Sequence, residues 1–303
     1  MDERETAFLV TGVTGFLGRR MLRKLLRERL PVIALVRGGR AIGTQRLSAQ
    51  ARAADLLAEL GCAEHSALLQ VIDADIADLV VDALSDQITE AMHHLGAKRL
   101  IVVNIAASLK MDFDGQAPAR REATRLLNQR TNVEGLENLI RTFDQLDDRA
   151  VDGRPVVASI VHFSTCYAHG RRTGVIEESA LNEDVRAENS YEQSKREGEF
   201  RLSRWQPARP HRIPVTIIRP SIVTGEGTRD GFLAWLNILS ETVQLDGLPG
   251  WARWILGVTE SSARLIDVGA KAARRLRLPC LPLLGNPEGV LDLIDVEDVE
   301  RYS

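Results

Sequence analysis

The sequence has few cysteines, no recognisable metal-binding pattern and no long apolar run. Its three cysteines, Cys62, Cys166 and Cys280, lie far apart and form no CxxC pair, which argues against a disulfide framework or a zinc site and fits a reducing cytoplasm. The six histidines show no HExxH spacing, so no metal is expected. No apolar stretch is long enough to cross a bilayer, and the charged start MDERETAFLV is unlike a secretory signal. We therefore expect a cytoplasmic protein without a transmembrane segment.

Neither sign of charge dominates the chain. Its 303 residues include 39 Lys and Arg against 42 Asp and Glu, for a formal net charge of −3. Without a basic excess the sequence lacks the electrostatic footprint of a nucleic-acid-binding protein. A composition of 44% hydrophobic and 27% charged residues is typical of a globular protein with one large domain and a smaller one.

Short apolar runs alternate with helical periodicity over the first 220 residues. Strands are expected at 7–10, 32–36, 68–73, 99–104, 155–164 and 213–220. Helical patterns follow the first strand and cover 45–60, the stretch up to about residue 95, 120–146 and 190–204. This alternation predicts an α/β fold in which helices cover both faces of a doubly wound parallel sheet of the Rossmann type.

The pattern changes after residue 225. Residues 231–278 are mostly helical in pattern, and 290–296 is a single late strand that we expect to return to the main sheet. The sequence thus predicts a main α/β domain over 1–225 and a smaller, mainly helical substrate-binding cap over 226–303 that closes over a cleft.

Three glycines at a spacing of three separate the first strand from the first helix, in the segment TGVTGFLG at 11–18. Glycine lets the backbone approach a phosphate without interference from a Cβ atom. The N–H groups and the dipole of a helix N-terminus favour negative charge at the same place. The segment therefore predicts a dinucleotide site. Its GxxGxxG spacing resembles that of short-chain dehydrogenases/reductases, especially the extended class, which carries TGxxGFLG.

The end of the second strand indicates which dinucleotide is bound. A site that prefers NAD usually has Asp or Glu there to hold the ribose 2′-OH, whereas this chain has Arg37, in LVRGG. A guanidinium can hold a 2′-phosphate with two hydrogen bonds. NADPH/NADP+ is therefore the expected cofactor, with Arg46 assisting, which makes 1–225 the NADP(H)-binding domain. Asp75 stands where extended-class members touch the adenine ring.

The segment NSYEQSKREGE carries the strongest chemical pattern. Tyr191 and Lys195 are four residues apart on a predicted helix, so both project from one face. An ammonium close to a phenol stabilises the phenolate and lowers the tyrosine pKa from its ordinary value near 10. We therefore expect Tyr191 to donate or accept a proton near neutral pH.

A hydroxyl at the end of the fifth strand, in HFSTCYAHG, could bind the substrate carbonyl. Ser164 and Thr165 are both candidates, and alignment with the extended-class pattern that ends in Gly170 places Thr165 at the catalytic position. The neighbouring Cys166 is read as a small residue packed under the site, since no His–Cys pairing pattern accompanies it. His162 and His169 are read as structural.

Several further residues fit the same site, although strand-end packing explains each of them as well. Asn104, Ala106 and Ala107 close the fourth strand with small side chains beside which a cofactor can pass. Asn132, in TNVEG, resembles the family asparagine that supports the lysine, often through water. The segment RPSIV at 219–223 follows the sixth strand, where the family backbone contacts the nicotinamide end.

A narrower resemblance combines these motifs. TGVTGFLG, LVRGG, NIAASLKMDFD, STCYAHGRRTGVIEE, NSYEQSK and RPSIVTGE together resemble the thioester-reductase and fatty acyl-CoA reductase branch of the extended short-chain dehydrogenases/reductases. The resemblance runs from about residue 7 to 226, and the segment LDLIDVEDV resembles the family more weakly. Two departures stand out: Asn104-Ile105 replaces the usual His or His-Asn, and the chain stops where family members continue into another helix. The latter leaves two alternatives, a module of something longer or an incomplete cap.

The resemblance implies NADPH-dependent reduction of an acyl thioester, carried by CoA or a carrier phosphopantetheine, to an aldehyde, and it leaves further reduction to an alcohol open. It implies catalytic roles for Thr165, Tyr191, Lys195 and Asn132. The residues expected to contact the cofactor are Gly12, Thr14, Gly15, Phe16, Leu17, Gly18, Arg37, Arg46, Asp75, Ile76, Asn104, Ala106, Ala107, Lys195, Pro220, Ser221, Ile222 and Val223.

Other readings stay open. An apolar stripe in the cap, comprising Phe232, Leu233, Trp235, Leu236 and Ile238, either lines an acyl tunnel or forms simple helix core. The same catalytic residues would serve a sugar-nucleotide epimerase or a hydroxysteroid-type dehydrogenase, although Arg37 argues against epimerases that retain NAD. A third alternative is a regulator that senses NADP(H) without catalysing a reaction. The Tyr191–Lys195 pair argues against it, because a sensor does not need these residues. By analogy with such folds, a homodimer through a helix pair is compatible with the sequence.

Overall fold

The computed structural model describes residues 5–42, 45–112, 116–150, 154–172, 175–179, 181, 184–208, 213–224 and 293–295. They fall into two units, which are described separately. The larger unit holds the described residues up to Ser221, and the smaller one holds 222–224 and 293–295.

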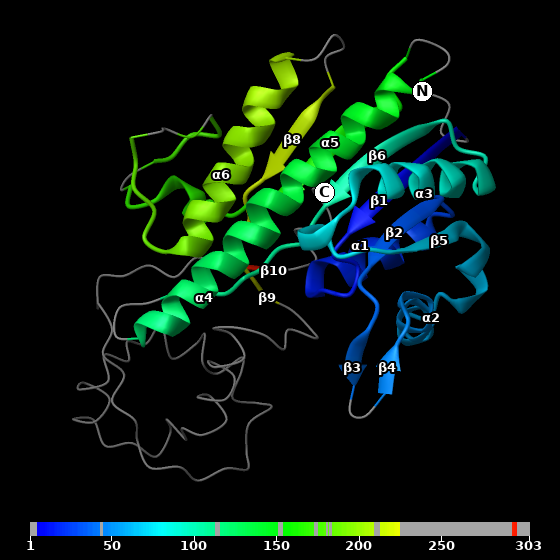
Figure 1. Cartoon of the computed structure of the whole chain (residues 1–303), viewed down its shortest axis with the longest axis horizontal. Coiled ribbons are helices and arrows are strands. Elements are labelled where there is room, and N and C mark those ends of the chain that lie inside the picture. The colour runs from blue at the N-terminus through cyan, green and yellow to red at the C-terminus, as the bar shows by residue number, and fades with distance from the viewer. Residues whose placement is uncertain are drawn as a thin grey trace. The chain divides into compact units, whose positions relative to one another are not determined.

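The larger unit is built on a six-stranded sheet in the order β5-β2-β1-β6-β7-β8 (Figure 1). Every neighbouring pair in it is parallel. The strands are β1 (Thr6–Thr11), β2 (Val32–Val36), β5 (Leu69–Asp73), β6 (Arg99–Asn104), β7 (Val157–Phe163) and β8 (Val215–Ile218). All five residues of β2 are buried, as expected for a strand covered on both faces. The predicted doubly wound parallel sheet is thus confirmed.

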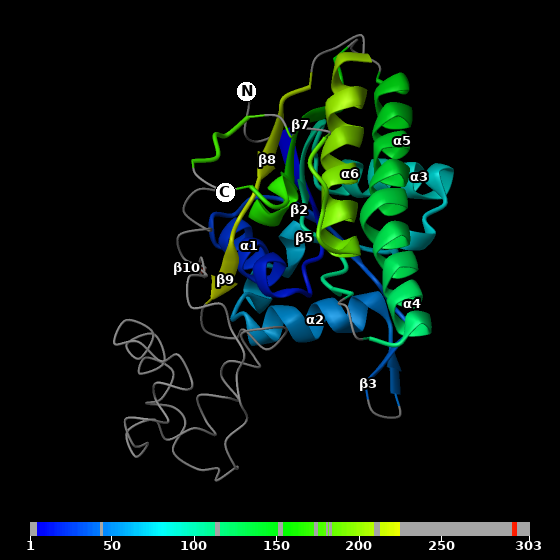
Figure 2. The ribbon, with the colours of Figure 1, turned by 90° about the vertical axis from the view of Figure 1, so that its left-hand side faces the viewer.

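Helices lie on both faces of this sheet (Figure 2). One face carries α1 (Phe16–Arg27) and the other carries α3 (Val81–His94), α5 (Gly135–Asp148) and α6 (Ser190–Trp205). The remaining helices are α2 (Ala49–Glu59), α4 (Pro118–Asn128) and the short turns η2 (Ala63–Leu68), η3 (Ile76–Asp78), η5 (Cys166–His169) and η6 (Gln206–Ala208). The core beneath these helices is aliphatic, and it includes Leu9, Ile33, Ile88, Leu100 and Leu139, all essentially inaccessible to solvent.

One helix begins later than its sequence predicts. The expected helix over 45–60 is wrong at its start, because β3 (Arg40–Ile42) and β4 (Gln45–Leu47) pair as an antiparallel hairpin. Ser48 then caps α2 by accepting a hydrogen bond from the Ala51 amide at 3.1 Å. A serine side chain at that position satisfies one of the free amides of the first turn, so the helix starts directly after it.

The helix expected over 120–146 is continuous but changes its winding. Between α4 and α5 the chain forms a π-helical turn, η4 (Gln129–Glu134). Such turns are rare and are often found at functional sites, and this one holds Asn132, which the sequence had already assigned to the site.

The smaller unit contains one parallel strand pair, β9 (Ile222–Thr224) with β10 (Leu293–Asp295). The late strand expected at 290–296 is therefore present, but its partner is β9 and not a strand of the six-stranded sheet. The remainder of the predicted cap over 226–303, including the apolar stripe at 232–238, lies outside the described residues. The boundary at 225 and the helical character of the cap stay predictions.

Candidate active site

The glycine turn after β1 is shaped by contacts that only glycine permits. Gly12 has φ +75°, and a Cβ atom there would lie 2.8 Å from the Ala106 amide nitrogen. A Cβ atom on Gly18 would lie 2.1 Å from the Gly12 carbonyl oxygen, so this glycine lets α1 pack directly on the turn. Since Cβ atoms cannot come so close to backbone, both positions require glycine.

The start of α1 is open to an anion. Gly15 is its N-cap and offers no side-chain hydrogen bond, and the first turn contains no acidic residue. Thr14 and Gly15 are exposed. Unpaired amides at the positive end of a helix, beside a turn without side chains, fit the diphosphate of a dinucleotide. The half-buried ring of Phe16 packs against Arg20, whose guanidinium carbon lies 5.4 Å from the ring centroid.

The loop after β6 is fastened to β1 by one hydroxyl. Thr11 donates to Asn104 Oδ1 at 2.7 Å and accepts from the amides of Ile105 and Ala106 at 3.1 and 3.0 Å. The Asn104 amide nitrogen lies 3.0 Å from His162 Nδ1. Asn104, the departure from the family pattern, thus joins the ends of three adjacent strands and is 4% exposed.

His162 lies beneath the site as a neutral side chain. Its burial, and secondarily the charge of Lys195, hold the pKa of the His162 imidazole well below its ordinary value of 6.5. Its Nε2 atom has no hydrogen-bond partner among the described residues.

The expected cofactor-selecting residues meet at the end of β2. Arg37 Nη1 lies 3.1 Å from Asp75 Oδ2, and its side chain is 58% exposed. Asp75 also caps η3 by accepting from the Ala77 amide at 3.1 Å. Ile76 packs its side chain into the core, which leaves only its backbone to face a cofactor. Arg46 lies in β4, and its side chain is outside the described part.

Two carboxylates, and not one, stand beside Arg37. Asp73, the last residue of β5, accepts the Gly38 amide at 2.7 Å, and a Cβ atom on Gly38 would lie 2.4 Å from the same carboxylate. Sequence reasoning missed Asp73, although its position at the carboxyl end of a strand next to β2 marks it as part of this edge.

Tyr191, Thr165 and Lys195 meet at the carboxyl ends of the central strands. Their exposed fractions are 7%, 4% and 4%. The Tyr191 phenol is hydrogen-bonded to the Thr165 side chain. Lys195 Nζ donates to the Phe163 carbonyl, at the end of β7. The sequence therefore placed these three residues correctly on the start of α6 and the end of β7.

The protonation states differ from the expectation. Burial raises the pKa of the Tyr191 phenol to about 12, and the Thr165 hydrogen bond offsets this only in part. Burial lowers the pKa of the Lys195 ammonium to about 8, against the opposing charge of Glu199. The prediction that Lys195 lowers the tyrosine pKa towards neutrality is wrong for this structure, because desolvation dominates. The Tyr191 phenol is therefore protonated at neutral pH.

The two hydroxyls that directly follow β7 have different hydrogen-bond partners. Ser164 donates its hydroxyl hydrogen to Glu199, whereas Thr165 faces Tyr191. Ser164 is thus committed to a neighbouring ionic cluster, and Thr165 is the hydroxyl beside the phenol.

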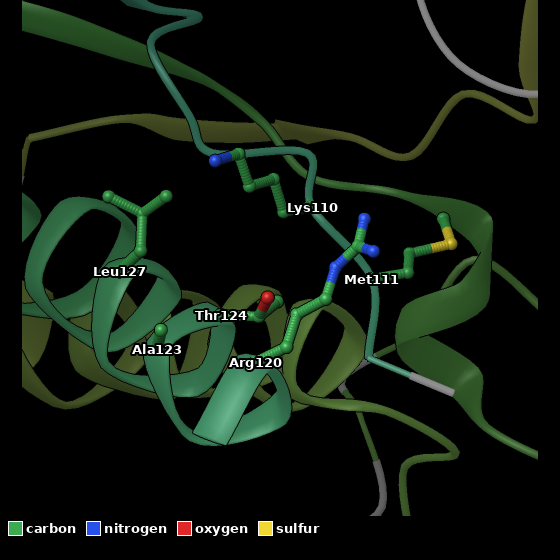
Figure 3. A pocket seen from close by; sticks show the side chains of 6 residues that line it. All are labelled: Lys110, Met111, Arg120, Ala123, Thr124 and Leu127. Carbon is green, nitrogen blue, oxygen red and sulfur yellow. The ribbon is translucent and has the colours of Figure 1, made fainter. Parts of the chain in front are cut away.

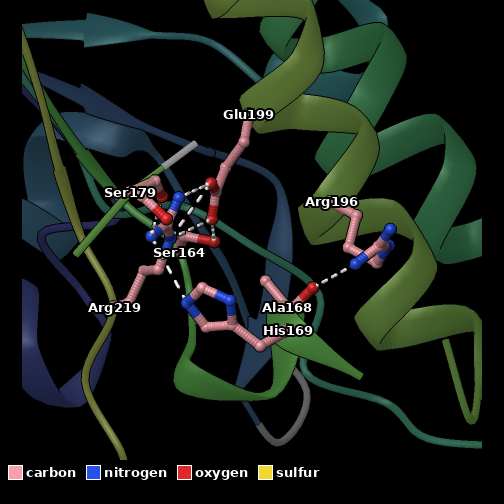
Figure 4. A network of polar contacts seen from close by, with 7 residues as sticks. All are labelled: Ser164, Ala168, His169, Ser179, Arg196, Glu199 and Arg219. Atoms are coloured by element: carbon pink, nitrogen blue, oxygen red, sulfur yellow. Dashed lines mark hydrogen bonds and ion pairs between the residues drawn. The ribbon is translucent and has the colours of Figure 1, made fainter. Parts of the chain in front are cut away.

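That cluster, which sequence reasoning missed, consists of Glu199, Arg219, Ser164 and His169 (Figure 4). Arg219 donates to both oxygens of Glu199, at 2.6 and 3.1 Å, and Glu199 is 2% exposed. His169 Nε2 lies 3.4 Å from Arg219 Nη1. The spacing of Lys195 and Glu199, four residues on one helix, was the available signal.

The Asn132 side chain contacts Ser194, the residue before Lys195, and not the lysine itself. Its side chain accepts from the Ser108 amide at 2.7 Å and donates to the Ser108 carbonyl and to Ser194 Oγ at 3.0 and 2.8 Å. It therefore holds the segment after β6 against α6, and no direct hydrogen bond between its side chain and Lys195 is found in the described part of the chain.

The segment after β8 is held to the segment after β7 by a backbone hydrogen bond. The Pro220 carbonyl accepts the Cys166 amide at 3.0 Å, and Ser221 ends the larger unit. Ile222 and Val223 belong to β9, in the smaller unit. Their expected contacts with the cofactor stay predictions.

The family is decided by a match over most of the chain. A family model described as "male sterility protein" aligns with residues 10–268. The chain belongs to this family. It is the fatty acyl-CoA reductase-like family of extended short-chain dehydrogenases/reductases, so the expected resemblance is confirmed. As a member, the chain is an NAD(P)-binding enzyme of the extended type. The glycine turn and the open start of α1 fit that cofactor.

Solved structures show the same fold. UDP-glucose 4-epimerase from Thermotoga maritima matches with a TM-score of 0.57 and 18% identity, over 97% of this chain and 71% of that one. UDP-glucuronic acid 4-epimerase from Bacillus cereus, in complex with UDP-glucuronic acid and NAD, matches with 0.53 and 18%, over 78% and 63%. The UDP-Glc/GlcNAc 4-epimerase from Campylobacter jejuni matches with 0.52 and 20%, over 78% and 61%.

This likeness concerns the fold alone. The chain spans less than two thirds of the length of the Bacillus cereus and Campylobacter jejuni enzymes. No curated protein matches the sequence. None of the helices in the described part of this family member has both the length and the apolar character of a membrane span.

Proposed function

We propose that the protein reduces an acyl thioester, carried by CoA or a phosphopantetheine, to an aldehyde with NADPH, and that an alcohol is a further product if the aldehyde is reduced again. The observation that carries the proposal is the buried phenol: Tyr191 is hydrogen-bonded to Thr165 and its pKa is raised to about 12. A phenol that stays protonated suits a reaction in which a carbonyl oxygen must receive a proton, which is the direction of reduction.

NADPH, when bound, supplies a hydride to the thioester carbonyl carbon. Tyr191 donates its proton to the carbonyl oxygen, and the Thr165 hydroxyl stabilises the negative charge that develops there. The Lys195 ammonium, held by the Phe163 carbonyl, keeps positive charge beside the phenol. The resulting hemithioacetal returns its hydroxyl proton to the Tyr191 oxygen and breaks its C–S bond. It leaves as the aldehyde and a thiolate, and the thiolate takes a proton from water to become the thiol.

NADPH is the proposed cofactor because Arg37 stands, half exposed, at the end of β2. Its guanidinium can bind a 2′-phosphate, and Asp75 holds it at that edge. Gly12, Gly15, Gly18 and the Ala106–Ala107 segment are the proposed seat of the diphosphate and of the rest of the dinucleotide, with Arg46 assisting.

The alternative is a sugar-nucleotide epimerase or dehydrogenase, which the shared fold allows. Such an enzyme must first remove a proton from a hydroxyl, and for that it needs a phenolate. Because the phenol of Tyr191 is protonated far above neutral pH, the site favours the reductase.

The proposal is tested by NADPH oxidation with a panel of acyl-CoA, carrier-bound acyl and UDP-sugar substrates. We expect oxidation with acyl thioesters only. In Tyr191→Phe, turnover should fall by about 10²–10⁴-fold, the usual contribution of a positioned proton donor, while NADPH binding measured by fluorescence is retained. Turnover of UDP-sugars alone, or a fully active Tyr191→Phe, would contradict it.

A further inference from the structure

A pocket of about 320 Å³ lies between the segment after β6 and α4 (Figure 3). This is within the size range of small-molecule sites in proteins. It is lined by Lys110, Met111, Arg120, Ala123, Thr124 and Leu127. The reaction proposed above assigns it no role.

The charge around the pocket is of one sign. Lys110 and Arg120 line it from opposite walls, and no carboxylate is among its lining residues. In the described part of the chain neither cation has an ion-pair partner. Arg125, on the same helix, does have one, since its Nη2 lies 2.6 Å from Glu122. Among the described residues, the pocket therefore offers an anion two cations that have no ion-pair partner.

The position of Arg120 adds to this field. It lies in the first turn of α4, which has no acidic residue and no side-chain cap at Ala117. A cation in the first turn opposes the helix dipole. That placement costs stability in the isolated helix, and it becomes favourable when an anion sits between the helix start and the two cations.

Beside the two cations the pocket is lined by one polar residue, Thr124, and by three apolar ones. Met111, Ala123 and Leu127 face the pocket beside the cations. An anion alone would not use this surface, whereas a phosphate that continues into an aliphatic arm would cover it.

The pocket is tied to the catalytic helix by short hydrogen bonds. Asn128, at the end of α4, donates to the Lys110 carbonyl at 2.8 Å and to Ser190 Oγ at 2.9 Å. Asp112 accepts from the Ser190 amide at 2.7 Å. Ser190 immediately precedes Tyr191. These hydrogen bonds join the end of α4 that lines the pocket, next to Leu127, to the residue before the phenol.

We propose that this pocket binds the phosphate end of the 4′-phosphopantetheine arm that CoA and acyl-carrier proteins share, with Lys110 and Arg120 on the phosphate and the apolar residues against the arm. The inference rests on the proposed function, because it concerns the carrier of the same thioester.

The test compares one acyl group on three carriers: CoA, 4′-phosphopantetheine and pantetheine, which lacks the phosphate. The variant Lys110→Gln/Arg120→Gln should raise KM for the two phosphorylated substrates by about tenfold to a hundredfold, the effect of losing charge-assisted hydrogen bonds. Its kcat, and its KM for acyl-pantetheine, should stay unchanged. Arg125→Gln, which removes a charge from the same helix outside the pocket, should match the wild type.

Three results would overturn the inference: equal KM values for the double variant and Arg125→Gln, an equal rise for acyl-pantetheine, or a rise for acyl-CoA without one for acyl-phosphopantetheine. The last would assign the pocket to the adenosine phosphates of CoA. Calorimetric binding of 4′-phosphopantetheine needs no turnover. If that binding is lost in the double variant while the wild type reduces no thioester, the pocket is supported and the proposed function fails. If the wild type reduces thioesters but does not bind 4′-phosphopantetheine, the proposed function is supported and the inference about the pocket fails.

Discussion

At the scale of single residues, burial governs the chemistry of the site more than the spacing of the charges does. Tyr191 and Lys195 lie on one helix face as the sequence indicates, yet desolvation moves their pKa values to about 12 and about 8. The order of the two values is that of a site in which the phenol keeps its proton and the ammonium is the first group to lose one.

This order predicts the pH dependence of the reduction. The active form carries a protonated phenol and a charged ammonium, so kcat should be constant below the Lys195 pKa and should fall as pH rises through about 8. Tyr191 adds no further change until about 12. A pH–rate profile with a saturating acyl-CoA checks this. A rate that increases with pH would indicate a phenolate base and contradict the assignment.

Arg37 predicts the cofactor preference. Arg37→Ala should weaken NADPH binding by up to about tenfold, which corresponds to about 1.4 kcal/mol and allows for the exposure of the guanidinium. NADH binding should change little, because NADH has no 2′-phosphate. Titration of both cofactors by fluorescence measures the effect, with Arg23→Ala, an exposed residue of α1, as the control. An equal loss for both cofactors would mean that Arg37 only stabilises the edge of the sheet.

At the scale of elements, the site depends on how α6 is joined to the strands. The Glu199–Arg219 pair connects α6 to the residue after β8, and Ser164 extends the connection to the residue after β7. These contacts set the position of the helix that carries both Tyr191 and Lys195. A surface ion pair such as Arg201–Glu137, between α6 and α5, does not have this role.

Removal of one partner from the buried pair should therefore be costly. Glu199→Gln leaves Arg219, whose side chain is only 16% exposed, without its carboxylate partner, and we expect a loss of about 3–5 kcal/mol in the free energy of unfolding. Glu137→Gln removes the partner of an exposed arginine and should cost about 1 kcal/mol or less. Urea denaturation of both variants makes the comparison. Similar losses for the two would show that Glu199 is held no more tightly than a surface carboxylate.

Periodicity and glycine spacing predict the elements well because both are local. The strands at 32–36 and 99–104 and the helix after Gly15 follow from residues adjacent in the chain. The β3–β4 hairpin does not follow from local sequence. Residues 45–47 are also compatible with a helix, and only their pairing with 40–42 makes them a strand. The Glu199–Arg219 pair and the Ser164–Glu199 bond join residues 20 and 35 positions apart, and no local pattern shows that burial will bring them together.

At the scale of the whole molecule, the described part of the chain holds the residues that we propose for cofactor binding and for proton donation. Its sheet order, its glycine turn and the family match over residues 10–268 agree on a nicotinamide-dependent enzyme. The segment expected to hold the acyl chain, at 226–303, lies almost entirely outside the described residues. The reaction itself is therefore the test of the account.

The most direct measurement is the amount of free thiol released for each NADPH oxidised with an acyl-CoA substrate. Reduction of the thioester predicts one thiol per NADPH if the aldehyde is the product and one thiol per two NADPH if the alcohol is. In Tyr191→Phe, thiol release and NADPH oxidation should both fall by about 10²–10⁴-fold. NADPH oxidation without thiol release, or thiol release without NADPH oxidation, would contradict the account.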